Sequence, residues 1–240
     1  MKILGIDTSA NVASVAIVQD DVLICEYTLN YKLTHSQTLM PMIDEICKAC
    51  EFDMSTLDFI AVASGPGSFT GLRIGAATAK GLAQGLNIPI VAVPTLDGLA
   101  CNVPFTKNII CPIMDARRGQ VYTSLYIWND NTLKRITDYM SEEMDNLLNI
   151  IKEDGSTVIF LGDGVPVYKT KIEENLDEEL YSFAPLNCNI QRAASIAALG
   201  KVLFEQGISE SYLDFSPFYL RKSQAEREYE EKIKSSEKND

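Results

Sequence analysis

The sequence has little histidine and no long apolar run, and each shortage excludes a class of site or location. His35 is the single histidine among 240 residues. A paired-histidine metal site of the HxxxH type needs a second imidazole one helical turn further on, and Leu39 occupies that position. No apolar run approaches the roughly 20 residues of a membrane span, and the N-terminus lacks the pattern of a signal peptide. We therefore expect no metal site, no membrane span and a cytoplasmic location.

Basic residues are also scarce, because 21 Lys and Arg stand against 33 Asp and Glu and give a formal net charge of -12. Phosphate binding draws on clustered Lys and Arg, so any RNA substrate is expected to be held by another protein. The six cysteines are scattered, which indicates reduced and mostly buried thiols in a chain of this length. Cys47 and Cys50 form a CxxC pair without the second ligand pair of a zinc site, so core packing is the favoured interpretation.

The most informative stretch is a glycine-rich link between an expected strand at Phe59 to Ala63 and an expected helix at Leu72 to Leu86. The link and the first turn of the helix have the sequence SGPGSFTGLRIG. It is not a Walker A loop, since Gly71 is followed by Leu and Arg, and it is not a dinucleotide fingerprint, since the third glycine falls on Thr70. The link still ends at the positive pole of a helix, where an anion can bind.

Small residues recur every four positions along this helix, at Gly71, Gly75, Ala79 and Ala83, and therefore line one face. Another backbone can approach such a face closely. Glycine inside a helix costs about 1 kcal/mol relative to alanine, so packing or function has to compensate. The pattern alone leaves two interpretations open, packing on the sheet of the same chain and contact with a partner.

The chain shows an internal repeat of its opening plan. An apolar strand at Lys2 to Asp7 ends in an aspartate before a tight turn, and Asn108 to Asp115 does the same. Later, Thr157 to Leu161 leads into a second glycine loop. We therefore expect a divergent duplication, with two mixed β-sheet subdomains flanked by helices in an α/β fold. Asp7 either faces a metal-bound phosphate or satisfies the amides of its turn.

The expected organisation divides the chain at Pro104. In the second half, the pattern predicts a strand at Val121 to Trp128 and helices at Ser141 to Lys152 and Ala193 to Gln206. The expected units are an N-terminal subdomain over 1–104, a C-terminal subdomain over 105–212, a segment of about 213–223 that returns to the first subdomain, and a charged, flexible tail over 224–240.

Four passages together resemble one family: SGPGSFTGLRIG, the opening LGIDTSANVASVAIV, HSQTLMPMIDEI and the late PFYLR. They are similar to the TsaB family, also called YeaZ, of tRNA threonylcarbamoyladenosine biosynthesis, and the similarity extends to Arg221. The resemblance implies the duplicated fold shared by actin and sugar kinases, in which nucleotide usually lies between the halves. On that basis the candidate nucleotide-binding residues are Asp7, Thr8, Ser9 and Asp115.

The resemblance also implies a non-catalytic subunit. TsaB-like proteins pair with a homologous, metal-bearing catalytic protein, TsaD, which transfers a threonylcarbamoyl group to the adenosine beside the anticodon, and an ATPase, TsaE, joins them. This chain would need no cofactor, metal or catalytic residue of its own, while the complex uses ATP. In the family the contact is a bundle of the two helices at Thr34 to Cys50 and Leu72 to Leu86. The candidate interface residues are therefore Leu39, Ile43, Ile46, Gly71, Gly75, Ala79 and Ala83.

Two other classes of function stay open at this stage. The chain could be an enzyme, namely a nucleotide-dependent ATPase or kinase that uses Asp7. It could also have the metallopeptidase activity once attached to the wider family, but the presence of a single histidine disfavours a peptidase. It could also be a self-associating scaffold, since the small-residue face can pair with itself to form a homodimer. Nucleotide turnover by the isolated chain, and light scattering with and without a partner, separate these alternatives.

Overall fold

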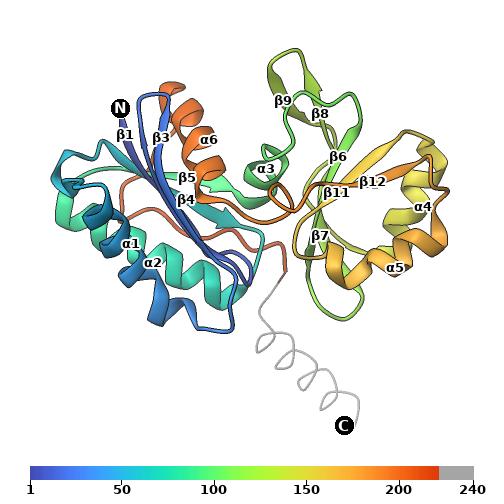
Figure 1. Cartoon of the computed structure of the whole chain (residues 1–240), viewed down its shortest axis with the longest axis horizontal. Helices are drawn as coiled ribbons and strands as arrows, with labels where there is room; N and C mark the ends of the chain where they lie inside the picture. Colours follow the sequence, from blue (N-terminus) through green and yellow to red (C-terminus); the bar gives the residue numbers. More distant parts are fainter. Residues whose placement is uncertain (222–240) are drawn as a thin grey trace, which may run out of the picture.

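Two β-sheets, one for each half of the chain, organise the computed structural model, which describes residues 1–221 (Figure 1). In the first sheet the strand order is β3-β2-β1-β4-β5, with β1 antiparallel to β2 and parallel to β4. All seven residues of β4 are buried, as expected for an inner strand covered on two faces. The strands are β1 (Lys2–Asp7), β2 (Ala13–Gln19), β3 (Val22–Leu29), β4 (Phe59–Gly65) and β5 (Ile90–Pro94).

The second sheet repeats this plan in the order β10-β7-β6-β11-β12, with β6 antiparallel to β7 and parallel to β11. A hairpin of β8 and β9 is added beside β6. The duplicated α/β plan with two mixed sheets is therefore confirmed. The strands are β6 (Ile109–Asp115), β7 (Gln120–Thr123), β8 (Tyr126–Asn129), β9 (Thr132–Arg135), β10 (Met140–Glu143), β11 (Val158–Leu161) and β12 (Tyr181–Phe183).

Helices cover the sheets in matching positions. In the first half α1 follows β3 and α2 follows β4, and in the second half α4 follows β10 and α5 follows β11. Each buries an apolar stripe against its own sheet, and in α1 that stripe includes Leu39, Ile43 and Ile46. The helices are α1 (His35–Ala49), α2 (Phe69–Leu86), α3 (Thr95–Ala100), α4 (Met144–Asp154), α5 (Val165–Asn175) and α6 (Ala193–Glu205), with a short 3₁₀ helix at Met54–Thr56.

The last helix of each half packs against the sheet of the other half. From the first half, α3 inserts Leu96 and Leu99 among residues of β6, β8 and β11. From the second half, α6 packs Ile196 and Ala197 against β1, β4 and β5. The prediction that placed Ala193 to Gln206 in a subdomain over 105–212 is therefore wrong for this helix. Alternate residues of a strand face opposite sides of a sheet. In the first sheet, α1 and α2 cover one of these faces, and α6 covers the other.

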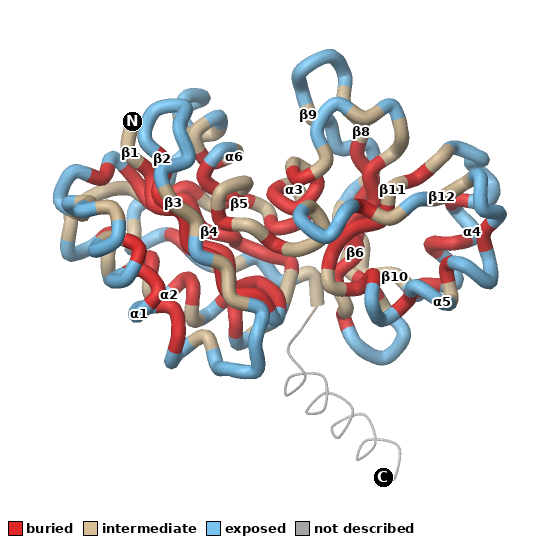
Figure 2. The backbone as a smooth tube through the Cα atoms, in the orientation of Figure 1, coloured by how far each residue is buried: buried red, intermediate tan, exposed pale blue. Residues whose placement is uncertain are grey.

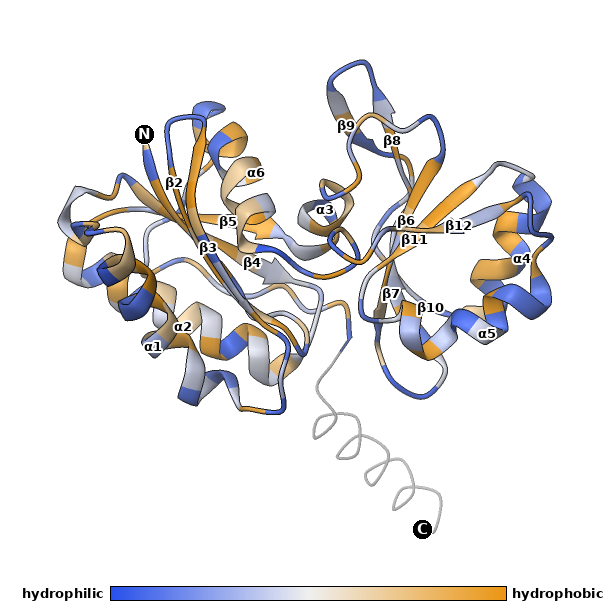
Figure 3. Ribbon diagram, viewed as in Figure 1, coloured by the Kyte–Doolittle hydropathy of each residue, from blue (hydrophilic) through white to orange (hydrophobic). Residues whose placement is uncertain are grey.

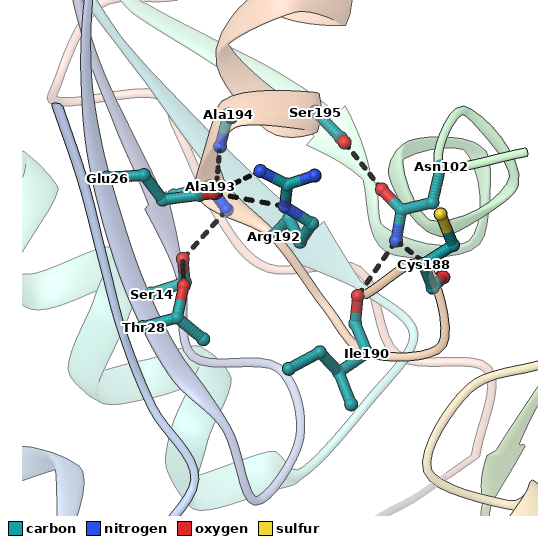
Figure 4. Close-up of polar contacts among 10 residues, drawn as sticks. All are labelled: Ser14, Glu26, Thr28, Asn102, Cys188, Ile190, Arg192, Ala193, Ala194 and Ser195. Atoms are coloured by element: carbon teal, nitrogen blue, oxygen red, sulfur yellow. Dashed lines mark hydrogen bonds and ion pairs between the residues drawn. The ribbon is translucent and has the colours of Figure 1, made fainter. Parts of the chain in front are cut away.

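A polar network fixes the place where the chain crosses back to the first sheet (Figure 4). The carboxylate of Glu26, on β3, accepts hydrogen bonds from Arg192 Nε at 3.0 Å and from the Ala194 amide at 2.9 Å. Ser14 Oγ accepts from the Ala193 amide at 3.0 Å. Asn102, just beyond α3, donates to the carbonyl oxygens of Cys188 and Ile190. Side chains of the first half therefore satisfy the free amides at the start of α6.

Removal of the Glu26 carboxylate should loosen this crossing. We expect Glu26→Ala to lower the free energy of unfolding by about 1–2 kcal/mol, because Arg192 and an amide of α6 lose their acceptor in a partly buried place. Urea denaturation checks the value. Glu205→Ala, an exposed carboxylate at the other end of the same helix, is the matched control. An equal effect of the two substitutions would contradict this role for Glu26.

Two further elements differ from the prediction. The strand expected at Val121 to Trp128 is interrupted and forms two strands, β7 and β8. Between them, the Ser124 hydroxyl and the Leu125 amide donate hydrogen bonds to Thr137. Residues 141–143, expected to begin a helix, belong instead to the edge strand β10, which pairs with β7. An acidic, polar stretch suits the first turn of a helix, but pairing with an unpaired sheet edge prevails over that local preference.

The burial pattern follows the sheets. Inner strands are buried and hydrophobic in each half, while loops and the outer sides of helices are exposed and polar (Figures 2 and 3). Across residues 1–221, no helix combines the length and apolar character required to cross a bilayer. The predicted tail over 224–240 lies outside the described residues.

Candidate functional site

A cleft of about 390 Å³ lies between the two halves. Its walls are the β1–β2 turn, the glycine link before α2, the β6–β7 turn, the loop that follows β11 and the C-terminal segment at residues 219–221. Of the four residues predicted to bind nucleotide, Ser9 and Asp115 line this cleft. They come from the matching turns of the two halves, so the duplication brings them together.

The other two predicted residues, Asp7 and Thr8, are outside the cleft lining and are used within their own half. One carboxylate oxygen of Asp7 accepts the Ser9 amide at 2.9 Å and the Ser9 hydroxyl at 2.6 Å. Thr8 Oγ1 donates to the Gly71 carbonyl oxygen at 2.8 Å. Their side chains are 2% exposed, so they fix the turn beneath the cleft.

The glycine link fits against this turn because it carries no side chains at the contact points. A methyl group added at Gly67 or Gly71 would overlap the carbonyl oxygen of Ser9 or Thr8, respectively. The Ser68 amide donates to the Ser9 carbonyl oxygen at 2.7 Å, and Ser68 Oγ caps α2 by accepting from the Gly71 amide. Two of the three glycines that suggested an anion loop, Gly67 and Gly71, therefore also serve close backbone packing.

Three aspartates gather near the cleft. Burial raises the pKa of Asp7 to about 6, partly offset by the hydrogen bonds from Ser9. Burial also raises the pKa of Asp163 to about 6, and the nearby carboxylates of Asp115 and Asp7 add to the rise. Asp115 is paired with Arg117 at 3.4 Å. The negative charge of the cleft therefore changes in the range around pH 6.

Sequence reasoning missed three parts of this cleft. Asp163 lines it from the loop after β11, and Tyr219 and Arg221 line it from the C-terminal segment. The signal for Asp163 was present, since Gly162-Asp163-Gly164 ends β11 as the first glycine link ends β4. Tyr219 and Arg221 belong to the family passage PFYLR and to the segment of about 213–223 that was expected to return to the first subdomain, but neither observation indicated the cleft.

The seven residues predicted to contact a partner are buried inside the chain, and that prediction is wrong as a description of an exposed surface. They pack α1 and α2 against the first sheet, or lie against the β1–β2 turn. The alternative interpretation, packing on the sheet of the same chain, holds. A stripe of small and apolar residues has the same spacing whether it faces its own sheet or another protein. The residues are Leu39, Ile43, Ile46, Gly71, Gly75, Ala79 and Ala83.

A different face of α2 is open. Gly81 and Gly85 lie one turn apart, and a methyl group added at either would meet no atom of residues 1–221 within 4 Å. Thr70 and Ala77 are exposed on the same side. On the neighbouring helix α1, Met40 is 49% exposed. We call these five residues the outer face.

The histidine at the start of α1 is bonded to the backbone. His35 Nε2 lies 2.7 Å from the Ala10 carbonyl oxygen, and the side chain is half-buried. Within residues 1–221 no three His, Cys, Asp or Glu side chains are grouped so that they could hold a metal ion.

Comparisons with known proteins relate the chain to proteins of tRNA threonylcarbamoyl modification. The model of the family "TsaD: tRNA N6-adenosine threonylcarbamoyltransferase" matches residues 23–229. The tRNA threonylcarbamoyladenosine biosynthesis protein TsaB of Bacillus subtilis is 37% identical over 98% of this chain and 100% of its own length. TsaB of Haemophilus influenzae is 28% identical over 92% of this chain and 94% of its own.

A solved structure has the same fold. YeaZ from Pseudomonas aeruginosa superimposes with a TM-score of 0.78 at 23% identity, over 91% of this chain and 99% of that one. The family model relates the chain to threonylcarbamoyltransferases and the solved structure shows the shared fold. The relative that matches along its full length carries the assignment: the chain belongs to the TsaB family of tRNA threonylcarbamoyladenosine biosynthesis proteins.

Proposed function

We propose that this chain acts in tRNA threonylcarbamoyladenosine biosynthesis as a non-catalytic subunit that binds a TsaD-like catalytic homologue. The relatives named above and the transferase family model support the pathway. A single histidine, with Leu39 one turn further on, supports an accessory role, because the paired imidazoles of the catalytic relative cannot form. ATP would be consumed by the complex, in which a TsaE-like ATPase takes part, and the partner would hold the tRNA.

The observation that carries the partner proposal is the pair of unexplained glycines on α2. Gly71 and Gly75 face Thr8 so closely that a side chain would not fit. Gly81 and Gly85 face open space, yet each costs about 1 kcal/mol relative to alanine inside a helix. Close approach of a helix from another chain is a use that compensates for this cost, since glycine lets two backbones come near.

The place of the outer face fits a helical partner. The helices α1 and α2 lie side by side on one surface of the first half (Figure 1). Ile74 and Leu82 of α2 are only partly buried and remain available for contact. A homologue that presents its own equivalent helices would complete a four-helix contact. A second copy of this chain fits the same face, which makes a homodimer the competing occupant.

Bulky side chains on the outer face should block the partner without unfolding the chain. We expect Gly81→Leu and Gly85→Leu to weaken the affinity for the TsaD-like homologue at least tenfold, measured by calorimetry. Their melting temperature should not fall, because leucine favours a helix more than glycine does. Asn149→Leu, at an exposed position of α4 in the other half, is the matched control.

Several outcomes would count against the proposal. Wild-type affinity in the folded leucine variants would exclude the outer face, and no association at micromolar concentration would exclude the partner. A tRNA modification assay that proceeds at full rate without this chain would exclude the accessory role. Self-association that is lost in the same variants, with no binding of the homologue, would favour the homodimer.

The cleft supports a second candidate, nucleotide binding between the halves. Ser9 and the capping residue Ser68 offer hydroxyl groups on one wall, and Asp115 and Arg117 face them from the other. Calorimetric titration of the isolated chain with ATP and Mg²⁺ tests this candidate, with Asp115→Ala as the variant. Turnover of ATP by the isolated chain, lost in that variant, would favour the enzyme alternative.

A further inference from the structure

Residues 213–221 contain no helix or strand. They run along α2 in the direction opposite to the helix, because Phe215 lies at Lys80 and Tyr219 lies at Phe69. Phe215 is 1% exposed and belongs to the core between α2 and the first sheet. Lys80 Nζ donates to the Phe215 carbonyl oxygen at 2.9 Å. This end of the segment is therefore anchored firmly on the first half.

The segment next crosses the glycine link. The Phe218 amide donates to the Ser64 carbonyl oxygen at 2.7 Å, and a side chain at Gly65 would overlap the Phe218 carbonyl oxygen. The Tyr219 ring lies 4.8 Å from the Phe69 ring at the start of α2. The absence of a side chain at Gly65 therefore lets the segment pass.

The segment then reaches the second half across the cleft. Arg221 Nη1 donates to the carbonyl oxygen of Ala116, in the β6–β7 turn, at 2.9 Å. The Phe218 ring lies 5.9 Å from the Tyr139 ring of the second half. Contacts with the first half are numerous and partly buried, whereas the hydrogen bond of Arg221 is made by a single side chain that lines the cleft. The Phe218–Tyr139 contact lies near α3, because Tyr139 is itself bonded to Asp97. An opening of the cleft would therefore break the Arg221 bond before the contacts with the first half.

The connections that would act as a hinge lie elsewhere. Asp97 of α3 accepts hydrogen bonds from Tyr126 at 2.6 Å and Tyr139 at 2.9 Å, so α3 is tied to the second half. The returning chain is tied by Asn102 to the end of α3. Figure 1 shows α3 on one side of the junction between the halves and the end of the described chain on the other. Rotation about the α3 side would open the cleft at the C-terminal segment.

We propose that residues 213–221 are an intramolecular latch that sets how far the two halves close around the cleft. Phe215 anchors the latch on the first half, and Arg221 fastens it to Ala116 on the second. Closure by such a latch needs no partner, so it is independent of the accessory role proposed above.

The distance between the halves in the full chain tests the latch. Fluorophores on unnatural residues at the exposed positions Asp44 and Glu153 report that distance by single-molecule energy transfer. We expect Arg221→Ala to raise the ratio of open to closed molecules about fivefold, because the charged hydrogen bond to the Ala116 carbonyl oxygen is lost. Phe218→Ala combined with Arg221→Ala should raise it further.

The controls separate a latch from a general loss of stability. Ser216→Ala, at an exposed position of the same segment, should leave the distance unchanged. Arg221→Lys, which keeps a donor, should restore part of the closed population. Arg221→Ala leaves the Phe215 anchor intact, so the variant should remain folded. An unchanged distance distribution in the folded Arg221→Ala and Phe218→Ala/Arg221→Ala variants would overturn the proposal.

Discussion

Replacement of Gly71 by alanine should lower the free energy of unfolding by about 2–3 kcal/mol, whereas the same replacement at Gly81 should raise it by about 1 kcal/mol. The two glycines belong to one helix, α2, and differ in what surrounds them. A methyl group at Gly71 would overlap the backbone oxygen of Thr8, which the β1–β2 turn holds in place. At Gly81 the added methyl meets nothing within 4 Å, so only the gain in helix propensity remains.

Urea denaturation of the two variants and the wild type gives the comparison. Gly85→Ala is a second test of the open face and should behave as Gly81→Ala does, since its surroundings are equally empty. A loss of stability at Gly81 similar to that at Gly71 would mean that α2 packs against more of the chain than the structure shows. A neutral Gly71→Ala would mean that the β1–β2 turn moves easily.

The second large effect is on the pH dependence of stability. In the unfolded chain an aspartate titrates near pH 3.8, whereas Asp7 and Asp163 in the folded chain titrate near pH 6. Between these values the folded state binds more protons than the unfolded state. The contribution of each carboxyl group to the free energy of unfolding therefore falls by about 3 kcal/mol as the pH rises from about 4 to about 6.

Substitution of the two carboxyl groups should remove this dependence. Asp7→Asn keeps an oxygen that accepts from Ser9, and Asp163→Asn keeps one that accepts from Gln191. We expect the double variant to be more stable than the wild type at pH 7.5 and to show a flatter profile in urea denaturation at pH 4.5, 5.5, 6.5 and 7.5. Asp138→Asn, at an exposed position, is the control. Parallel profiles for the wild type and the double variant would contradict the burial argument.

The order of elements and their duplication could be predicted from the sequence, because both depend on local patterns. The strands that end in Asp7 and Asp115, and the helix after the glycine link, follow from apolar runs and turn residues close to one another in the chain. The sheet that α6 covers could not be predicted in this way. A helix rich in alanine has the same pattern on either sheet, and only the face left open by α1 and α2 decides where it packs.

The candidate site was predictable only where its residues belong to a repeated motif. Ser9 and Asp115 lie in equivalent turns of the internal repeat, and the resemblance to the family named them as candidates. Arg221 reaches the cleft through contacts of Phe215 and Phe218 that no local pattern reveals. The partner surface was misplaced for a related reason, because small residues at helical spacing are found on buried and exposed faces alike.

The exchange of terminal helices between the halves has a consequence for synthesis on the ribosome. One face of the first sheet remains uncovered until α6 has been made, although β5 is complete at Pro94 and α6 ends at Glu205. At about 5–20 residues per second, the nascent chain would present that apolar face for roughly 5–20 s. The first half is therefore expected to rely on chaperones during translation and to be degraded when synthesis stops before α6.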